Sequence, residues 1–272
     1  MNPKHTFLDS GFVRLINHMG TDEDIVRCAR QSYDDLHEEL SPEKTRRLIF
    51  YLMEHWHTSP FEMCEIQLEI QAPLFVVQQL LRHRTASINQ LSMRYTDAPD
   101  LDYVPELERI QGTHKTNKQG SGEGLQEERQ YQAMDILIKT QERTDTAYRY
   151  LQDLGVANEL ARVVLPASRY TRLVWKIDLH NLFHFLRLRL HPHAQYEIRV
   201  MAEQIARIAR ELWPVSYEAF EEFRLHSVTF SRSEMERLRG LLDGERVDES
   251  PILGSERRGK EFRKKLAQSV DR

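Results

Sequence analysis

Apolar and polar residues alternate strictly along two stretches of the chain. In residues 64–71 the apolar positions are Cys64, Ile66, Leu68 and Ile70. Residues 170–177 repeat the pattern, with one side formed by Thr171, Leu173, Trp175 and Ile177. Successive side chains of a strand point to opposite faces, so each stretch predicts a half-buried strand. A further strand is predicted at residues 11–19.

Other parts of the chain follow a helical period. Before Pro214, apolar residues recur every three or four positions, at Ile198, Met201, Ile205, Ile208 and Leu212. This spacing predicts a long amphipathic helix that ends at the proline. Three more helices are predicted at residues 22–33, capped by Thr21, at residues 42–54, after Ser41, and at residues 179–190.

Two shorter helical signals lie in the first half of the chain. Pro73 opens a short helix whose far end carries Gln79, Arg82 and His83. Ser59 and Glu62 have the spacing of a capping box, which predicts that Ser59 is a helix N-cap. Strands and helices interleave irregularly, and this order favours an α+β fold over a wound parallel sheet.

Two regions differ in composition from the rest. Residues 108–124 contain four glycines and no apolar period, which predicts a mobile loop. Residues 226–272 are highly charged and end in a basic stretch, which predicts a partly helical extension ending in a solvated tail. We therefore expect a single catalytic domain within residues 1–225.

Composition narrows the class of protein. Of the 272 residues, 40% are apolar and 29% are charged, as in globular proteins that bury a core. A net charge of −4 gives no overall attraction to nucleic acid or to anionic membranes, so any basic site must be local. No apolar run approaches the ~20 residues that span a bilayer, and the first ten residues do not resemble a secretory signal. The chain has only two cysteines, Cys28 and Cys64, which favours a reducing cytoplasm.

Residues 82–95 contain the densest group of side chains that could bind a ligand or take part in catalysis. They read R-H-R-T-A-S-I-N-Q-L-S-M-R-Y and contain no lysine or glutamate of the kind that dilutes a solvated surface. A buried, unpaired guanidinium costs several kcal/mol, so the run is not a core strand. Arginine offers planar, bidentate donors that suit phosphate. The run therefore predicts a pocket for an anionic ligand.

The order of the motifs resembles that of the flavin-dependent thymidylate synthases. Arg82-His83-Arg84, seven residues and then Ser92 match the R-H-R-x7-S signature of this family, and Arg94 and Tyr95 continue the match. Residues 57–62 (H-T-S-P-F-E) resemble the family's H-x-[ST]-P-F-E segment. Residues 161–166 (A-R-V-V-L-P) and residues 188–195 (L-R, then H-A-Q) resemble two later blocks. These blocks keep the family's order across about residues 11–220.

The resemblance implies a fold, a reaction and an assembly. The fold would be a mainly helical α+β domain around a central antiparallel sheet. The enzyme would methylate dUMP to dTMP, with 5,10-methylenetetrahydrofolate as carbon donor and NADPH-reduced FAD as hydride donor. It would be a homotetramer with active sites shared between chains.

By the same resemblance, eleven residues would contact FAD: His57, Ser59, Glu62, Arg82, His83, Arg84, Gln90, Asp178, His180, His184 and His193. Asp178, His180 and His184 depart from the N-x-R…N pattern of many relatives, so the polar groups at that point have changed.

Nine residues would contact dUMP: Gln79, Arg82, Gln90, Leu91, Ser92, Met93, Arg94, Arg162 and Arg189. Gln90 stands where the family more often carries glutamate, and its amide has no negative charge. Arg189 and Ser92 are the catalytic candidates. Arg189 would stabilise the negative charge left when uracil loses its N3 proton, while Ser92 would contact dUMP by a hydrogen bond. No base is placed in sequence to make Ser92 a nucleophile.

Two other classes of function are less well supported. His180 and His184 have the spacing of a zinc pair, but position 181 is Asn where a zinc hydrolase would carry glutamate, so no metal is expected. A nucleic-acid-binding protein could use the arginine run and the basic C-terminal stretch. Neither alternative explains the four ordered blocks.

Overall fold

The computed structural model describes residues 2–33, 40–113, 121–243, 252 and 255–267. The chain divides into two compact units, residues 1–217 and residues 218–272. All the residues predicted to form the active site belong to the first unit.

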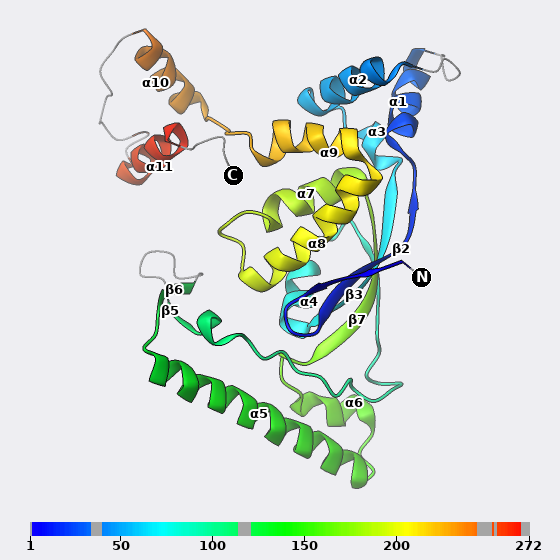
Figure 1. Ribbon diagram of the computed structural model, residues 1–272, viewed down its shortest axis with the longest axis vertical. Helices are drawn as coiled ribbons and strands as arrows, with labels where there is room; N and C mark the ends of the chain where they lie inside the picture. The colour runs from blue at the N-terminus through cyan, green and yellow to red at the C-terminus, as the bar shows by residue number, and fades with distance from the viewer. Residues whose placement is uncertain (1, 34–39, 114–120, 244–251, 253–254, 268–272) are drawn as a thin grey trace. The chain divides into compact units, whose positions relative to one another are not determined.

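A five-stranded antiparallel sheet lies at the centre of the first unit, in the order β1-β2-β3-β7-β4 (Figure 1). Its strands are β1 (Lys4–Phe7), β2 (Gly11–Met19), β3 (Glu65–Pro73), β7 (Tyr170–Asp178) and β4 (Ser87–Gln90). The three predicted strands are confirmed as β2, β3 and β7. Strands β1 and β4 were not predicted, and β4 is an edge strand inside the arginine-rich run.

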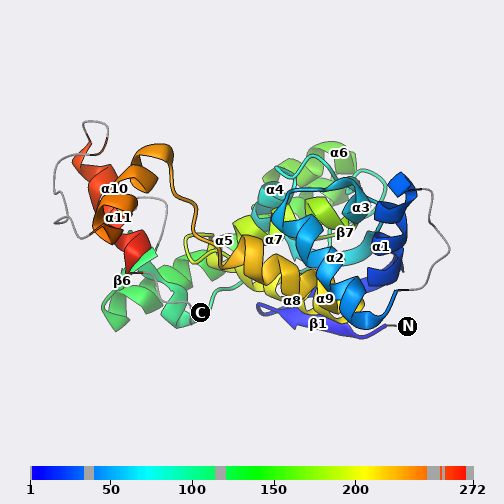
Figure 2. The same cartoon turned by 90° about the horizontal axis from the view of Figure 1, so that it is seen from above.

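One face of the sheet is covered by helices. Side chains on this face, from Ile66, Leu68 and Ile70 of β3, are fully buried, as the alternation predicts. Helices α4 (Leu74–Leu80), α7 (Leu179–Arg189) and α8 (Tyr196–Leu212) lie on this side, and both views place α7 beside α8 (Figures 1 and 2). Trp175 of β7 meets Phe185 of α7 edge to face, with ring centroids 5.2 Å apart. The opposite face carries ion pairs, including Arg14 with Glu69.

The helices near the N-terminus include α1 (Asp22–Arg30), α2 (Pro42–Glu54) and α3 (Ser59–Glu62). The first predicted helix becomes a 3-10 turn after Arg30, at Gln31–Tyr33. The predicted capping box at Ser59 is wrong. The N-cap is Thr58, whose helical backbone (φ −87°, ψ −32°) differs from the extended cap geometry and whose side chain makes no capping hydrogen bond.

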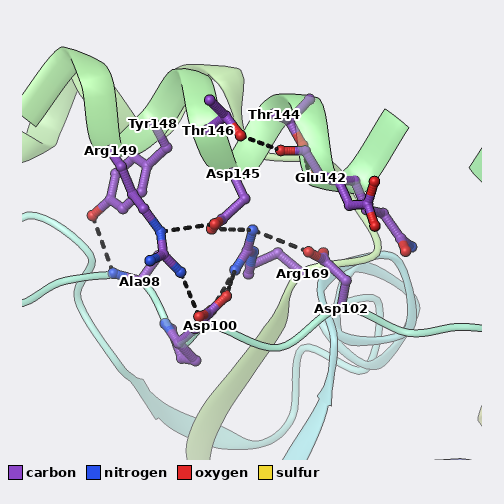
Figure 3. A network of polar contacts seen from close by, with 12 residues as sticks. Ala98, Asp100, Asp102, Glu142, Thr144, Asp145, Thr146, Tyr148, Arg149 and Arg169 are labelled. Atoms are coloured by element: carbon purple, nitrogen blue, oxygen red, sulfur yellow. Dashed lines mark hydrogen bonds and ion pairs between the residues drawn. The ribbon is translucent and has the colours of Figure 1, made fainter. Parts of the chain in front are cut away.

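A long helix that the sequence analysis missed, α5 (Glu127–Asp153), is fixed to the sheet by a buried arginine (Figure 3). Arg169 is 1% exposed and lies just before β7. Its guanidinium donates to the carbonyl oxygen of Pro99 at 2.7 Å and pairs with Asp102 at 3.0 Å and with Asp145 of α5 at 3.2 Å. One side chain thus connects α5, the segment after the arginine-rich run and β7.

The predicted loop at residues 108–124 includes regular structure in its described parts. It contains part of a 3-10 turn (Leu107–Arg109) and two short paired strands, β5 (Gln111–Thr113) and β6 (Ser121–Gly124). Residues 114–120 lie outside the described residues. Two short helices follow α5, namely α6 (Asn158–Ala161) and the 3-10 turn Arg162–Val164.

Helix α9 (Pro214–Phe220) crosses from the first unit into the second and continues as a π-helical turn, Glu221–Leu225. The second unit also contains α10 (Arg232–Leu242) and α11 (Glu256–Leu266). Phe262 of α11 is buried against Phe230, and Lys265 pairs with Glu234 of α10 at 2.7 Å. The basic residues Arg257, Arg258, Lys260, Arg263 and Lys264 lie exposed on α11, and Gly259 and Phe262 form its buried side. No helix in the described part of the chain has the length and apolarity needed to cross a membrane.

Candidate active site

The end of α4 and the end of α7 bring three predicted site residues together. Helix α4 ends at Leu80, one turn earlier than predicted, so Arg82 and His83 lie in the turn that follows it. The Nε of Arg189 donates to Nε2 of His83 at 3.0 Å, and its Nη2 donates to the backbone carbonyl of Gln79 at 3.4 Å. Segments more than 100 residues apart in sequence thus form one polar cluster.

The environment of His83 keeps its imidazole neutral. Burial, then the nearby Arg189 and His184, lower the pKa of His83 from 6.5 to about 4. Because Nε2 accepts the bond from Arg189, the ring proton of neutral His83 is on Nδ1. Burial also lowers the pKa of Arg189, but a guanidinium remains protonated at neutral pH. His83 therefore orients a charged Arg189 without adding a second charge.

The predicted FAD-contacting residues at α3 and at the start of α7 form a second group. Helix α3 packs against α7, and His57, Ser59 and Glu62 are exposed there. Asp178 is the N-cap of α7, because its carboxylate accepts from the backbone N–H of Asn181 at 2.9 Å and from its side chain at 2.7 Å. The changed residue at position 178 thus has a structural role in ordering the first turn of α7.

The predicted dUMP-contacting residues of the arginine-rich run form a third group at the sheet edge. Gln90 donates from Nε2 to Oγ1 of Thr171 at 3.2 Å. Ser92 Oγ accepts from the backbone N–H of Arg94 at 3.3 Å, and the Arg94 guanidinium pairs with Glu159 of α6 at 3.0 Å.

The other members of this group differ in exposure. The backbone N–H of Leu91 donates to the backbone carbonyl oxygen of Arg172 at 2.8 Å, and Met93 is 6% exposed. Arg162 is exposed on the 3-10 turn after α6.

An open groove of about 700 Å³ crosses the sheet near this third group. Its walls come from β2, β3, β4 and β7, and include Arg14, Glu69, Asn89, Gln90, Leu91 and Arg172. Register places Arg14, Glu69, Val174 and Asn89 in one row across the face that the helices leave uncovered. The groove can admit a polar ligand or a polar surface at the point where the arginine-rich run pairs with the sheet.

The first and third groups remain separate within one chain, whereas His184 of α7 lies beside His83, with ring centroids 6.4 Å apart. In the part of the chain that the structure describes, no hydrogen bond or ion pair connects the Gln79–His83–Arg189 cluster with residues 90–94 or Arg162. His193 lies in the turn after α7, with its ring 5.0 Å from that of His191. The described residues contain no group of three or more His, Cys, Asp and Glu side chains that could hold a metal ion.

The available donors fit a phosphate-bearing cofactor. Arg82 and Arg84 are both exposed next to the buried His83, and neither forms an ion pair within the described ranges. Two such guanidinium groups suit the pyrophosphate of a dinucleotide such as FAD.

Sequence reasoning did not assign a role to Gln195, although it lies in the H-A-Q block. Its Oε1 accepts from Nε2 of Gln79 at 2.5 Å, and its own Nε2 donates to Glu197 at 2.8 Å. The position of Gln195 in the H-A-Q block could have indicated that it has a role. Nothing in the local sequence indicates that Glu197 pairs with Arg109, 88 residues earlier.

An α+β domain with clustered arginines, side-chain amides and a neutral histidine suits an anionic nucleotide, and the comparisons agree. A family model described as "Thymidylate synthase complementing protein" matches residues 14–215. A flavin-dependent thymidylate synthase from Ruegeria pomeroyi is 44% identical over 262 residues, covering 95% of this chain and 86% of that protein. One from Thermus thermophilus is 48% identical over 238 residues, covering 88% and 86%.

A solved structure also supports an enzyme that methylates a uridine nucleotide. The crystal structure of a UMP/dUMP methylase, PolB from Streptomyces cacaoi, bound with 5-Br dUMP, superposes with a TM-score of 0.74 and 34% identity, covering 80% of this chain and 97% of that one. The chain belongs to the flavin-dependent thymidylate synthase family. The predictions of family, α+β fold, methyltransferase class and FAD dependence are confirmed, and the nucleic-acid-binding alternative is set aside.

Proposed function

We propose that this chain converts dUMP to dTMP, and that the cluster of Gln79, His83 and Arg189 binds and activates the nucleotide. The carbon comes from 5,10-methylenetetrahydrofolate. FAD that NADPH has reduced supplies the hydride that completes the methyl group. The observation that carries this proposal is the pairing of a charged Arg189 with a neutral His83 beside Gln79.

Arg189 acts on the uracil ring. Its Nε is held by His83, so the fork of the guanidinium has a fixed direction. A fixed cation against the uracil edge stabilises the anion that forms when N3 loses its proton, and this charge makes C5 more nucleophilic toward the methylene carbon. His83 is a positioning residue for this step.

The protein contributes no covalent nucleophile. Ser92 Oγ accepts a backbone hydrogen bond, and no side-chain base contacts it within the described residues. Cys64 is fully buried in the core, where burial raises the pKa of its thiol to about 12. Neither residue is activated for attack on the ring.

The FAD site is assembled from the exposed guanidinium groups of Arg82 and Arg84 with the group at α3 and α7. The arginines neutralise the pyrophosphate. His57, Ser59 and Glu62 line the adjoining surface together with His180 and His184 of α7. Gln90, Leu91, Ser92, Met93, Arg94 and Arg162 belong to the nucleotide site.

These groups come together between chains, in a homotetramer with shared sites. Two observations support this assembly. The Gln79–His83–Arg189 cluster has no direct polar contact with residues 90–94 or Arg162 within the described part of one chain, and the region from α5 to the turn after α6 exposes large apolar side chains. Among them, Val163 is 75% exposed, Ile136 64% and Leu160 63%. Arg162 is adjacent to Val163, so an interface that covers this surface places Arg162 next to another chain. We assign the protein to the cytoplasm, where free Cys28 and Cys64 remain reduced.

A spectroscopic experiment tests the reaction. The purified protein is incubated with FAD, and its visible spectrum is recorded anaerobically before and after NADPH. We expect a flavin band that NADPH bleaches, followed by dTMP formation when dUMP and methylenetetrahydrofolate are added. A protein that binds FAD and dUMP but yields no dTMP with both co-substrates would overturn the proposal.

A further inference from the structure

A chain of hydrogen bonds connects Gln79 to a buried carboxylate. Gln79 Nε2 donates to Oε1 of Gln195 at 2.5 Å, and Gln195 Nε2 donates to Oε2 of Glu197 at 2.8 Å. Glu197 lies in the first turn of α8 and is 5% exposed. The chain therefore runs from the surface of the candidate nucleotide site into the protein interior.

The buried end of this chain is fixed. Oε1 of Glu197 pairs with Nη2 of Arg109 at 3.0 Å and accepts from the hydroxyl of Tyr103 at 3.4 Å. Burial raises the pKa of Tyr103, so its hydroxyl remains a donor. The Arg109 guanidinium also lies over the ring of Tyr196, 4.5 Å from its centroid. Arg109 and Tyr103 thus hold one oxygen of the carboxylate, while Gln195 donates to the other.

The chemistry of the carboxylate sets the direction of every bond in the chain. An ionised carboxylate only accepts hydrogen bonds, so the side chain of Gln195 must turn its NH₂ group toward Glu197. Its carbonyl oxygen then faces Gln79 and must receive an N–H. The NH₂ group of Gln79 is engaged in this bond, and its carbonyl oxygen is left for a ligand. A primary amide alone could present either end, but Glu197 permits only one.

We propose that Glu197 is a positioning residue that fixes the Gln79 amide with its carbonyl oxygen toward the nucleotide. The inference rests on the proposed function, in which that nucleotide is dUMP. Apart from its phosphate, dUMP has two donors, the N3–H of the base and the 3′-hydroxyl of the sugar. Gln79 accepts from one of them, while Arg189, which contacts the backbone of Gln79, can only donate. The two residues together present an acceptor and donors to the same ligand.

Glu197→Gln tests the proposal with almost no change in shape. Arg109 and Tyr103 still require an acceptor, so the carbonyl oxygen of the new amide stays with them and its NH₂ group faces Gln195. The side-chain amide of Gln195, and then that of Gln79, exchange the positions of their NH₂ and carbonyl groups. Gln79 then presents a donor where dUMP also presents one. We expect the Kd for dUMP, measured by calorimetry on the FAD-loaded enzyme, to rise about tenfold or more, because a hydrogen bond is lost and two donors oppose each other.

A swap of the two side chains is the matched control. Gln195→Glu combined with Glu197→Gln keeps the composition and the net charge. The carboxylate at position 195 accepts from both neighbours, so Gln79 keeps its original orientation. We expect the Kd of this double variant to return to within about threefold of the wild-type value. A purely structural role for Glu197 predicts no such rescue, because Arg109 still lacks its charged partner.

Two results would overturn the proposal. One is a dUMP affinity that is unchanged in Glu197→Gln. The other is a swap variant that binds dUMP as weakly as Glu197→Gln does. If Glu197→Gln does not fold, Gln195→Leu breaks the chain but keeps the Glu197–Arg109 pair. Wild-type affinity in that variant would equally contradict the proposal. Binding of dUMP to the wild-type enzyme is measured first, and its absence would refute the proposed function itself.

Discussion

Removing the guanidinium at position 189 should separate nucleotide activation from folding. In Arg189→Ala the cation that stabilises the uracil anion is lost. Deleting one such oriented donor typically lowers kcat by about 10²- to 10³-fold, or ~2.7–4 kcal/mol in activation free energy. The substitution also leaves Nε2 of the buried His83 without its donor at 3.0 Å, which costs about 1–3 kcal/mol of folding stability.

Single-turnover formation of dTMP by the pre-reduced enzyme, at saturating dUMP, measures the activation step. Arg189→Lys keeps a charge but loses the planar fork, so its rate should fall between those of the wild type and Arg189→Ala. Arg187→Ala is the matched control, because Arg187 lies two positions earlier on α7 and contacts neither His83 nor Gln79. A folded Arg189→Ala enzyme with a rate within about threefold of the wild type would refute the role of this arginine.

Three further predictions concern stability. Because the pKa of His83 falls from 6.5 to about 4 on folding, the unfolded state binds the proton first as the pH falls. The free energy of unfolding should therefore drop by up to about 3 kcal/mol between pH 6.5 and pH 4, and His83→Gln should remove this part of the pH dependence in urea titrations. Arg169→Met should destabilise the fold by about 3–5 kcal/mol because it leaves buried partners unpaired. Arg149→Ala, which removes only exposed ion pairs, should change the free energy of unfolding far less. Gly20→Ala should lower the free energy of unfolding, and with it Tm. The left-handed backbone of Gly20 (φ 84°) alone costs an alanine ~1–2 kcal/mol, and the loss should be well above this because the added Cβ would also overlap Sγ of Cys64.

Each of these predictions has a contradicting result. For the first, the pH dependence of the free energy of unfolding would survive in His83→Gln. For the second, Arg169→Met and Arg149→Ala would lose the same free energy of unfolding. For the third, the Tm of Gly20→Ala would lie within about 2 °C of the wild-type value.

The sheet was largely predictable because its central strands have one buried face. Burial on one side imposes a period of two on β3 and β7, and the apolar positions found in the sequence are the buried ones in the structure. Edge strand β4 lacks that signal, because only part of its surface is covered and its residues are mostly polar. Helix α5 was missed for a related reason. Of its 27 residues, only Gln141 and Tyr148 are buried, so no apolar stripe marks it.

The site was predictable only in part, because its contacts are between distant segments. The family motifs indicated Gln79, His83 and Arg189 separately, and folding brought them into one cluster. The partners that orient them follow from tertiary packing: Arg109 reaches Glu197 across 88 residues. The neutral state of His83 likewise depends on burial beside Arg189, which the sequence R-H-R does not reveal.

The origin of the hydride tests the central claim most directly. A single turnover is run anaerobically with enzyme-bound reduced FAD, dUMP and methylenetetrahydrofolate, and dTMP, oxidised flavin and the folate product are quantified together. The account predicts equal amounts of dTMP and oxidised flavin, with tetrahydrofolate as the folate product. Formation of dTMP with dihydrofolate and without oxidation of the flavin would contradict it, because the folate would then have supplied the hydride.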